Sequence, residues 1–170
     1  MILLLPLILT SLTVRAVGKR LSARGYKFAA AWDDWPAALA AGMSVVFICT
    51  AVTHFVEPQR SGLIATVPGL IPEPGLAVTA TGVIEFVLAA GLLVPRTRRL
   101  SALAAIVLLI ALFPANVVAA SGVEHAAAPS TALLPRTILQ LIFIVCVATP
   151  LFSRGFFVRS GPSHIGASEA

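Results

Sequence analysis

The sequence predicts an all-α, multi-pass transmembrane helical bundle, and three observations lead to this prediction. Of the 170 residues, 58% are hydrophobic and only 11% are Asp, Glu, Lys or Arg, whereas about 25% of the residues of a soluble domain are charged. Several apolar runs approach the ~20 residues with which a helix crosses a membrane. These runs lack the alternation that an outer-membrane barrel requires. The chain length allows one membrane domain, residues 1–170.

Five apolar segments are predicted to be helices that span the membrane. In chain order they cover residues 2–18, 36–56, 76–94, 100–120 and 137–152. The first and last are short for a span, so their ends are expected to reach the interface. The proline-rich connection 57–75 is either a short interfacial segment on the outer surface or a loop anchored by apolar contacts. Residues 160–170 are small and polar, which predicts a disordered tail.

The basic residues predict how the bundle is oriented. Ten of the twelve lysines and arginines lie at or after the end of the first segment, after the third segment or in the tail: Arg15, Lys19, Arg20, Arg24, Lys27, Arg96, Arg98, Arg99, Arg154 and Arg159. Only Arg60 and Arg136 lie in the other two connections. Since basic residues are enriched on the cytoplasmic side, we expect the N-terminus outside and the C-terminus inside.

Several other classes of protein and site are disfavoured. The net charge of +5 does not indicate a nucleic-acid partner, because the basic residues alternate with apolar runs instead of forming one polar face. Cys49 and Cys146 lie in apolar runs without CxxC spacing, as small buried hydrophobic residues do. We expect no metal, because one histidine and one deep carboxylate without a nearby cysteine form a poor site.

Glu85 is the acidic residue that interrupts segment 76–94. It lies nine residues from the outer end, and therefore ~14 Å deep at 1.5 Å per residue. An ionised carboxylate at that depth costs about 2.5–3.5 kcal/mol, so it should face the bundle interior. Thr81 lies on the same face, one turn nearer the outside. Glu85 is either an acid, base or ligand anchor in a pocket, or a group that fixes helix packing.

Polar residues from three other helices lie at the outer end, about one or two turns above Glu85. They are Thr50, His54, Asn116, Arg136 and Gln140. Pro114 should kink the fourth helix beside Asn116 and free a carbonyl group. We predict that these five residues, with Glu85 and Thr81, form an outward-facing polar pocket that binds a ligand.

Alternative interpretations of the individual residues stay open. His54 could be solvated at the interface, and Arg136 could extend to the interface or pair with Glu85. Asn116 and Gln140 could simply form hydrogen bonds between helices.

Four stretches together resemble the DoxX family of small bacterial membrane proteins. They are "HFVEP", "TGVIEFVLAAGLLVPRTRR", "FPANVVAA" and "RTILQ", in this order and spacing. The resemblance covers residues 36–152 and implies a four-helix core in the bacterial cytoplasmic membrane, with residues 1–18 as an extra N-terminal helix. It also implies an association with a quinone-linked redox system, but no catalytic residues.

Three functional classes follow. In the first, the pocket binds a quinone or another small amphiphile, and His54 and Glu85 handle protons. A redox partner protein would then supply the electrons, since no ligand set for haem, flavin or an iron–sulfur cluster is visible. In the second, the protein binds or moves a small molecule or lipid without redox chemistry. In the third, it is a structural or assembly subunit. Enzymatic activity and oligomeric state stay open.

Overall fold

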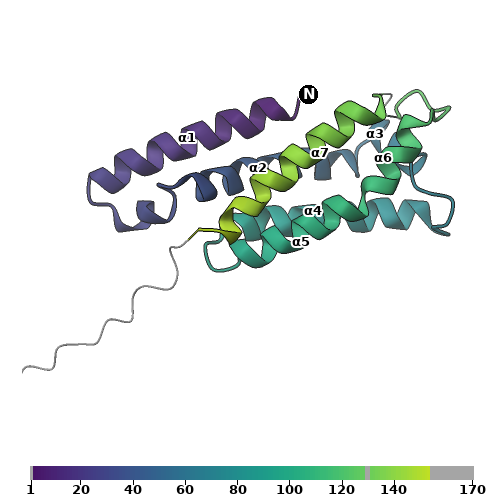
Figure 1. Ribbon diagram of the computed structural model, residues 1–170. Coiled ribbons are helices and arrows are strands. Elements are labelled where there is room, and N and C mark those ends of the chain that lie inside the picture. Colours follow the sequence, from purple (N-terminus) through teal and green to yellow (C-terminus); the bar gives the residue numbers. More distant parts are fainter. Residues whose placement is uncertain (1, 129–130, 154–170) are drawn as a thin grey trace, which may run out of the picture.

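The computed structural model describes residues 2–128 and 131–153, and every regular element in these ranges is a helix (Figure 1). The elements are α1 (Leu4–Ala23), η1 (Lys27–Ala31), α2 (Trp35–Thr53), α3 (Gln59–Ile64), α4 (Pro74–Leu93), α5 (Arg98–Ala111), α6 (Phe113–Ala120), α7 (Leu133–Ala148) and η2 (Thr149–Leu151). The predicted all-helical class is confirmed. The predicted disordered tail, 160–170, lies outside the described residues.

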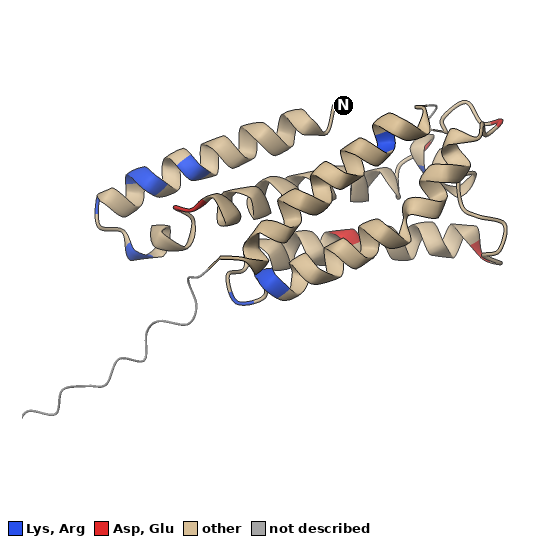
Figure 2. Ribbon diagram, viewed as in Figure 1, with Lys and Arg blue, Asp and Glu red and all other residues tan. Residues whose placement is uncertain are grey.

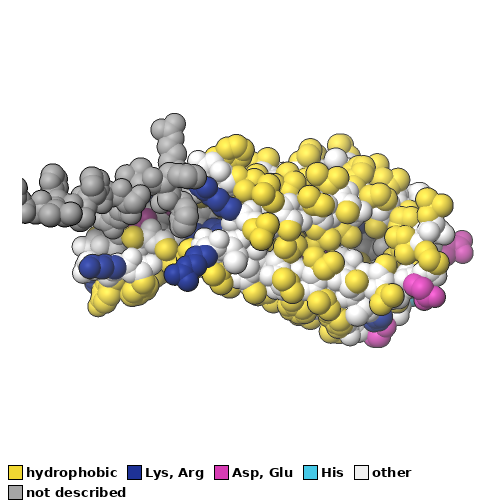
Figure 3. Space-filling view, turned by 90° about the horizontal axis from the view of Figure 1, so that it is seen from below, with side chains coloured by type: hydrophobic (Ala, Val, Ile, Leu, Met, Phe, Trp, Pro, Cys, Tyr) yellow, Lys and Arg dark blue, Asp and Glu magenta, His cyan; other side chains and the backbone are white. Residues whose placement is uncertain are grey.

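Within the described ranges, four helical stretches are long and apolar enough to cross a membrane. They are Trp35–Thr53, Pro74–Leu93, Arg98–Ala120 and Leu133–Leu151. Hydrophobic side chains cover the middle of the molecule, whereas charged side chains gather toward its two ends (Figure 3). This distribution fits a bilayer, whose core disfavours charge. The protein is therefore a membrane protein with at least four candidate spans.

Helix α1 is as long as a membrane span but more polar than the other four stretches. It runs to Ala23, five residues beyond the predicted end at Gly18, and so adds Lys19 and Arg20 to the helix that already contains Arg15. The predicted end lies where the apolar run ends. Lysine and arginine are good helix formers, so their presence does not end a helix. The helix therefore continues past the apolar run.

Helix α2 lies at the centre of the bundle. It packs against α1 on one side and α4 on the other, while α5 and α7 complete the group (Figure 1). Its start is capped by Asp34, whose carboxylate accepts a hydrogen bond from the backbone N–H of Ala37 at 2.8 Å. Met43, Val46 and Phe47 of α2 are buried in the core. The central position of α2 explains why its buried face is wide.

Basic residues gather at the end of the bundle that holds the α1–α2 and α4–α5 connections (Figure 2). The opposite end holds the α2–α4 and α6–α7 connections, with the acidic residues Glu57, Glu73 and Glu124. We call these the basic end and the acidic end. The two ends thus differ in charge, as the sequence predicts.

Gly42 lets α1 lie directly on α2. A Cβ atom at Gly42 would lie 2.7 Å from the carbonyl oxygen of Leu7 and even closer to the Ser11 hydroxyl. Backbone atoms cannot move aside as a flexible side chain can, so any larger residue must separate the two helices. Small residues permit this kind of close packing in membranes.

We expect Gly42→Ala to destabilise the contact between α1 and α2 by roughly 1–3 kcal/mol, the usual cost of overpacking. Thermal unfolding in mild detergent would measure the effect. Gly69→Ala is the matched control, because a Cβ at Gly69 would meet no atom within 4 Å. Equal melting temperatures for the two variants would contradict this account of the α1–α2 contact.

Candidate functional site

A cavity of about 440 Å³ lies toward the acidic end, between α2, α4, α6 and α7. Six predicted site residues line it: Thr50, His54, Glu85, Asn116, Arg136 and Gln140. The seventh, Thr81, is half-buried on α4, and its hydroxyl donates to the carbonyl oxygen of Ala77 at 2.9 Å. Thr81 does not line the cavity. The structure therefore brings together six of the seven residues around one space.

His54 and Glu85 face each other within this cavity. His54 ends α2, and its Nδ1 lies 2.8 Å from the carbonyl oxygen of Val78. Since a carbonyl oxygen only accepts, Nδ1 carries the proton of this hydrogen bond. The other ring nitrogen, Nε2, lies 3.6 Å from Oε2 of Glu85. The ring is thus held with Nε2 directed at the carboxyl group.

The carboxyl group of Glu85 is buried but incompletely paired. Its side chain is 6% exposed, and Oε2 accepts no hydrogen bond from any described residue. The 3.6 Å approach of His54 is longer than a hydrogen bond. A buried acceptor without a partner costs about 1–3 kcal/mol. The cavity therefore contains an acceptor that a bound molecule could satisfy.

Gly82 permits the approach of His54 to α4. A Cβ atom at this position would lie 2.7 Å from Cβ of His54 and 2.7 Å from the Phe55 ring. Gly82 therefore allows close contact between α2 and α4. Any larger residue at Gly82 would displace His54 from Val78 and Glu85.

A second polar group lines the opposite wall. Asn116 Nδ2 donates to Oε1 of Gln140 at 2.8 Å, and Gln140 Nε2 donates to the carbonyl oxygen of Leu109 at 2.7 Å. Arg136 donates to the carbonyl oxygen of Thr131 at 2.7 Å and to Asn116 Oδ1 at 3.5 Å. These bonds join α6, α7 and α5. The ion-pair contact of Glu85 is with His54, so Arg136 has a different set of partners.

The predicted kink near Pro114 is present as a break between α5 and α6. Helix α5 ends at Ala111, and α6 begins at Phe113 with Pro114 in its first turn. Proline has no N–H to donate, and non-helical backbone within a membrane needs other partners. The side chain of Gln140 provides one for Leu109. The break also places Asn116 on the cavity wall.

The α2–α4 connection contributes the short helix α3, which covers the cavity. Leu63 and Thr66 line the space, and Arg60 ties the segment to the carbonyl oxygens of His54 (2.8 Å) and Gly75 (3.3 Å). At its start, the hydroxyl and N–H of Ser61 donate to Glu57, and these bonds lower the pKa of that exposed carboxyl. The connection therefore contains a short helix, Gln59–Ile64, that is held to the ends of α2 and α4.

Further lining residues were not predicted from the sequence. Thr53, Thr66, Thr131 and Leu3 also line the cavity. Thr53 could have been found, because it is adjacent to His54. Leu3 and Thr66 belong to segments whose position relative to the four-helix core depends on tertiary packing.

A family model described as a domain of unknown function, DUF8561, matches residues 43–150. This range covers more than half of the chain. The chain belongs to the DUF8561 family. The matched range includes the polar cavity residues from Thr50 to Gln140 and leaves α1 outside. No curated protein and no solved structure matches the chain.

We expect Gly82→Ala to destabilise this DUF8561 protein although alanine is the better helix former, because the added methyl group would displace His54. Gly75→Ala on the same helix is the control, since its Cβ would meet only an Arg60 nitrogen at 3.9 Å. Thermal unfolding should place Gly82→Ala below the wild type and Gly75→Ala at or above it. The reverse order would contradict the role given to Gly82.

A double-mutant cycle on Asn116→Ala and Gln140→Ala should give a coupling free energy of about 0.6–1.7 kcal/mol, as found for interhelical hydrogen bonds in membranes. Reversible unfolding in detergent measures it. The control cycle pairs Asn116→Ala with Thr149→Ala, whose hydroxyl bonds Cys146 at the other end of α7, and should be additive. An additive result for Asn116 and Gln140 would show that their contact contributes nothing.

Proposed function

We propose that this protein binds a small amphiphilic molecule in the polar cavity at its acidic end. The observation that supports this most directly is the buried, unpartnered Oε2 of Glu85 beside His54, in a cavity of about 440 Å³. A residue that only locked a bundle would be expected to find a complete set of protein partners. Ionisable residues within membranes usually have functional roles.

The chemistry of the cavity suits a molecule with a polar head and an apolar body. One wall contains the His54–Glu85 pair, and the other contains Asn116, Gln140 and Arg136. Between them the lining is apolar, with residues such as Phe143 and Leu139. Pockets for small ligands combine such apolar walls with a few placed polar groups. The head group would hydrogen-bond at the two walls.

The proposed orientation puts this cavity on the outer side of a bacterial cytoplasmic membrane. The basic end would face the cytoplasm, because lysine and arginine are enriched there. In this arrangement α1 is a fifth span that begins outside, and the C-terminus is inside. The close packing of α1 along α2 supports this, and the basic last turns of α1 would extend into the cytoplasmic interface.

A quinone is the ligand class that we propose first, and here the resemblance to the DoxX family enters. The stretches that resemble this family include His54, Glu85, Asn116, Arg136 and Gln140, which line the cavity. A quinone head group needs hydrogen-bond donors and a route for protons, and His54 and Glu85 could exchange a proton with it. The electrons would come from a membrane or peripheral redox partner protein.

The second candidate is binding or transport of a lipid or another small molecule without redox chemistry. The largely apolar lining, which also includes Leu3 of the N-terminal segment, favours it as an alternative. A structural or assembly subunit is the third candidate, and the hydrogen bonds that join α5, α6 and α7 would suit it. The three candidates differ in which molecule, if any, stays bound in the cavity when the protein is purified.

Mass spectrometry of co-purifying molecules distinguishes the three. Wild type, Glu85→Gln and His54→Ala would be purified in mild detergent and checked for folding. Glu73→Gln is the matched control, because Glu73 is exposed and does not line the cavity. We expect wild type and Glu73→Gln to retain one amphiphile per chain, and the two site variants to lose most of it, since each loses a polar partner for the head group.

The identity of the retained molecule then decides between the first two candidates. A quinone supports the redox-associated function, whereas a lipid or another metabolite supports the second. Four equally empty preparations, with Glu85→Gln melting earlier than wild type, would contradict ligand binding and support a structural role.

A further inference from the structure

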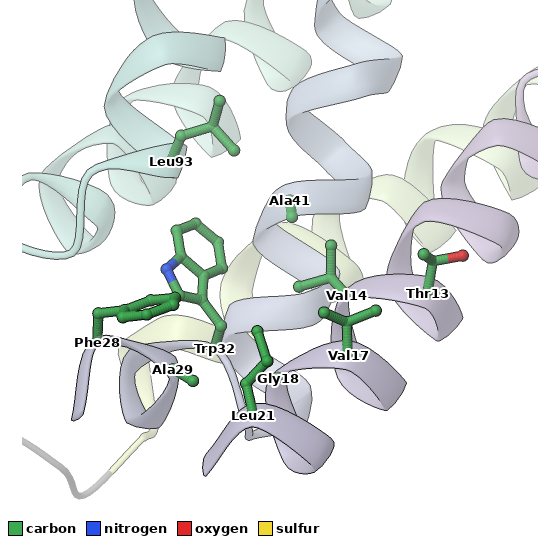
Figure 4. Close-up of a pocket in the computed structure, with 10 residues that line it drawn as sticks. All are labelled: Thr13, Val14, Val17, Gly18, Leu21, Phe28, Ala29, Trp32, Ala41 and Leu93. Carbon is green, nitrogen blue, oxygen red and sulfur yellow. The ribbon is translucent and has the colours of Figure 1, made fainter. Parts of the chain in front are cut away.

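A second cavity, of about 380 Å³, lies at the basic end of the molecule (Figure 4). Its lining is almost wholly apolar and comes from α1, η1, α2 and α4, with Val14, Val17, Phe28, Trp32 and Leu93 among its walls. Val17 and Phe28 are exposed, so the cavity opens to the surroundings along that side. It is separate from the polar cavity, with which it shares no residue.

Trp32 stands between this apolar space and a cation. Its indole ring points toward Leu93 within the cavity (Figure 4). The guanidinium carbon of Arg98 lies 4.4 Å from the centre of the same ring, which is a cation–π geometry. The cavity and the Arg98 guanidinium group are therefore adjacent.

The Arg98 side chain has donors left over at this position. Nε donates to the carbonyl oxygen of Leu92 at 3.0 Å, and Nη1 donates to that of Ala31 at 3.2 Å. Nη2 is buried and has no hydrogen-bond partner among the described residues. The indole N–H of Trp32 likewise forms no hydrogen bond within the described ranges, 2–128 and 131–153. Two donors beside one apolar cavity thus lack an acceptor.

The charge around the cavity is strongly positive. Eight basic residues belong to this end, Arg15, Lys19, Arg20, Arg24, Lys27, Arg96, Arg98 and Arg99, against the two acidic residues Asp33 and Asp34. Asp34 is already the cap of α2. An anionic group is therefore favoured here over a neutral or cationic one. Basic pockets between membrane helices bind the head groups of anionic lipids.

We propose that this cavity is a binding site for one anionic phospholipid from the leaflet at the basic end. One acyl chain occupies the apolar space between α1, η1 and α4. The phosphate accepts hydrogen bonds from Nη2 of Arg98 and the indole N–H of Trp32, since arginine and interfacial tryptophan are suited to this role. The lipid joins α1 and η1 to the four-helix core. This site is independent of the function proposed for the polar cavity.

Native mass spectrometry of the full chain in defined lipids tests this proposal. The protein would be presented with equal amounts of phosphatidylglycerol and phosphatidylcholine. We expect one phosphatidylglycerol per chain to be retained severalfold better than phosphatidylcholine, because both lipids offer a phosphate but the basic residues at this end disfavour the choline cation. No retained lipid, or equal retention of the two lipids, would overturn the proposal.

Two pairs of variants locate the site. Val17→Trp should fill the cavity and strongly reduce lipid retention, whereas Val87→Trp changes another exposed valine, on α4, that lines neither cavity and should retain the lipid. Arg98→Gln should remove the preference for the anionic lipid, whereas Arg96→Gln, at an exposed position, should keep most of it. Equal behaviour within either pair would overturn the assignment.

Arg98 also bonds backbone atoms, so its loss could affect folding itself. Trp32→Phe provides a second measurement, because it keeps an aromatic ring at this position while it removes the N–H together with part of the indole. We expect it to weaken phosphatidylglycerol retention severalfold, as the loss of one hydrogen bond does, with an unchanged melting temperature in lipid-free detergent. Unchanged retention would remove Trp32 from the head-group site and overturn that part of the proposal.

Discussion

The close contact between α2 and α4 is the constraint on which the rest of the structure depends. Gly82 brings the end of α2 against α4, so that His54 reaches the carbonyl oxygen of Val78. Deeper in the bundle, the buried hydroxyl of Ser44 donates to the carbonyl oxygen of Ala89 at 2.8 Å. In a membrane, where helix association gains little from the hydrophobic effect, such small residues and hydrogen bonds hold helices together. The helices α1, α5 and α7 pack around this pair.

The polar cavity differs between its two walls in how completely its groups are paired. Asn116, Gln140 and the broken end of α5 satisfy one another through short hydrogen bonds. Glu85, in contrast, keeps a buried oxygen without a partner. Partly satisfied polar groups in a low-dielectric interior are costly. The wall with Asn116 and Gln140 therefore joins helices, whereas the unpaired oxygen of Glu85 on the other wall is the observation on which the proposed ligand rests.

The two cavities lie at opposite ends of the bundle and differ in chemistry. The one toward the acidic end combines a titratable pair with amide and guanidinium groups, and α3 covers it through the contacts of Arg60. The one at the basic end is apolar inside, with the Arg98 guanidinium beside it. The N-terminal segment contributes to both, through Leu3, which directly precedes α1, and through Val14 and Val17 of α1. This segment thus borders both cavities although it lies outside the matched family range.

The sequence by itself determined the helical class, the approximate helices and most of the polar cavity. Apolar run length is a local property, and the depth of Glu85, Asn116 and Gln140 follows from counting along each run. The break before Pro114 was also predictable, because proline acts on its own helix. Only the tertiary structure decided that His54, not Arg136, contacts Glu85, and that Thr81 lies outside the cavity. Depth along a helix is set by the sequence, but rotation about its axis and the choice of neighbour are set by packing between helices.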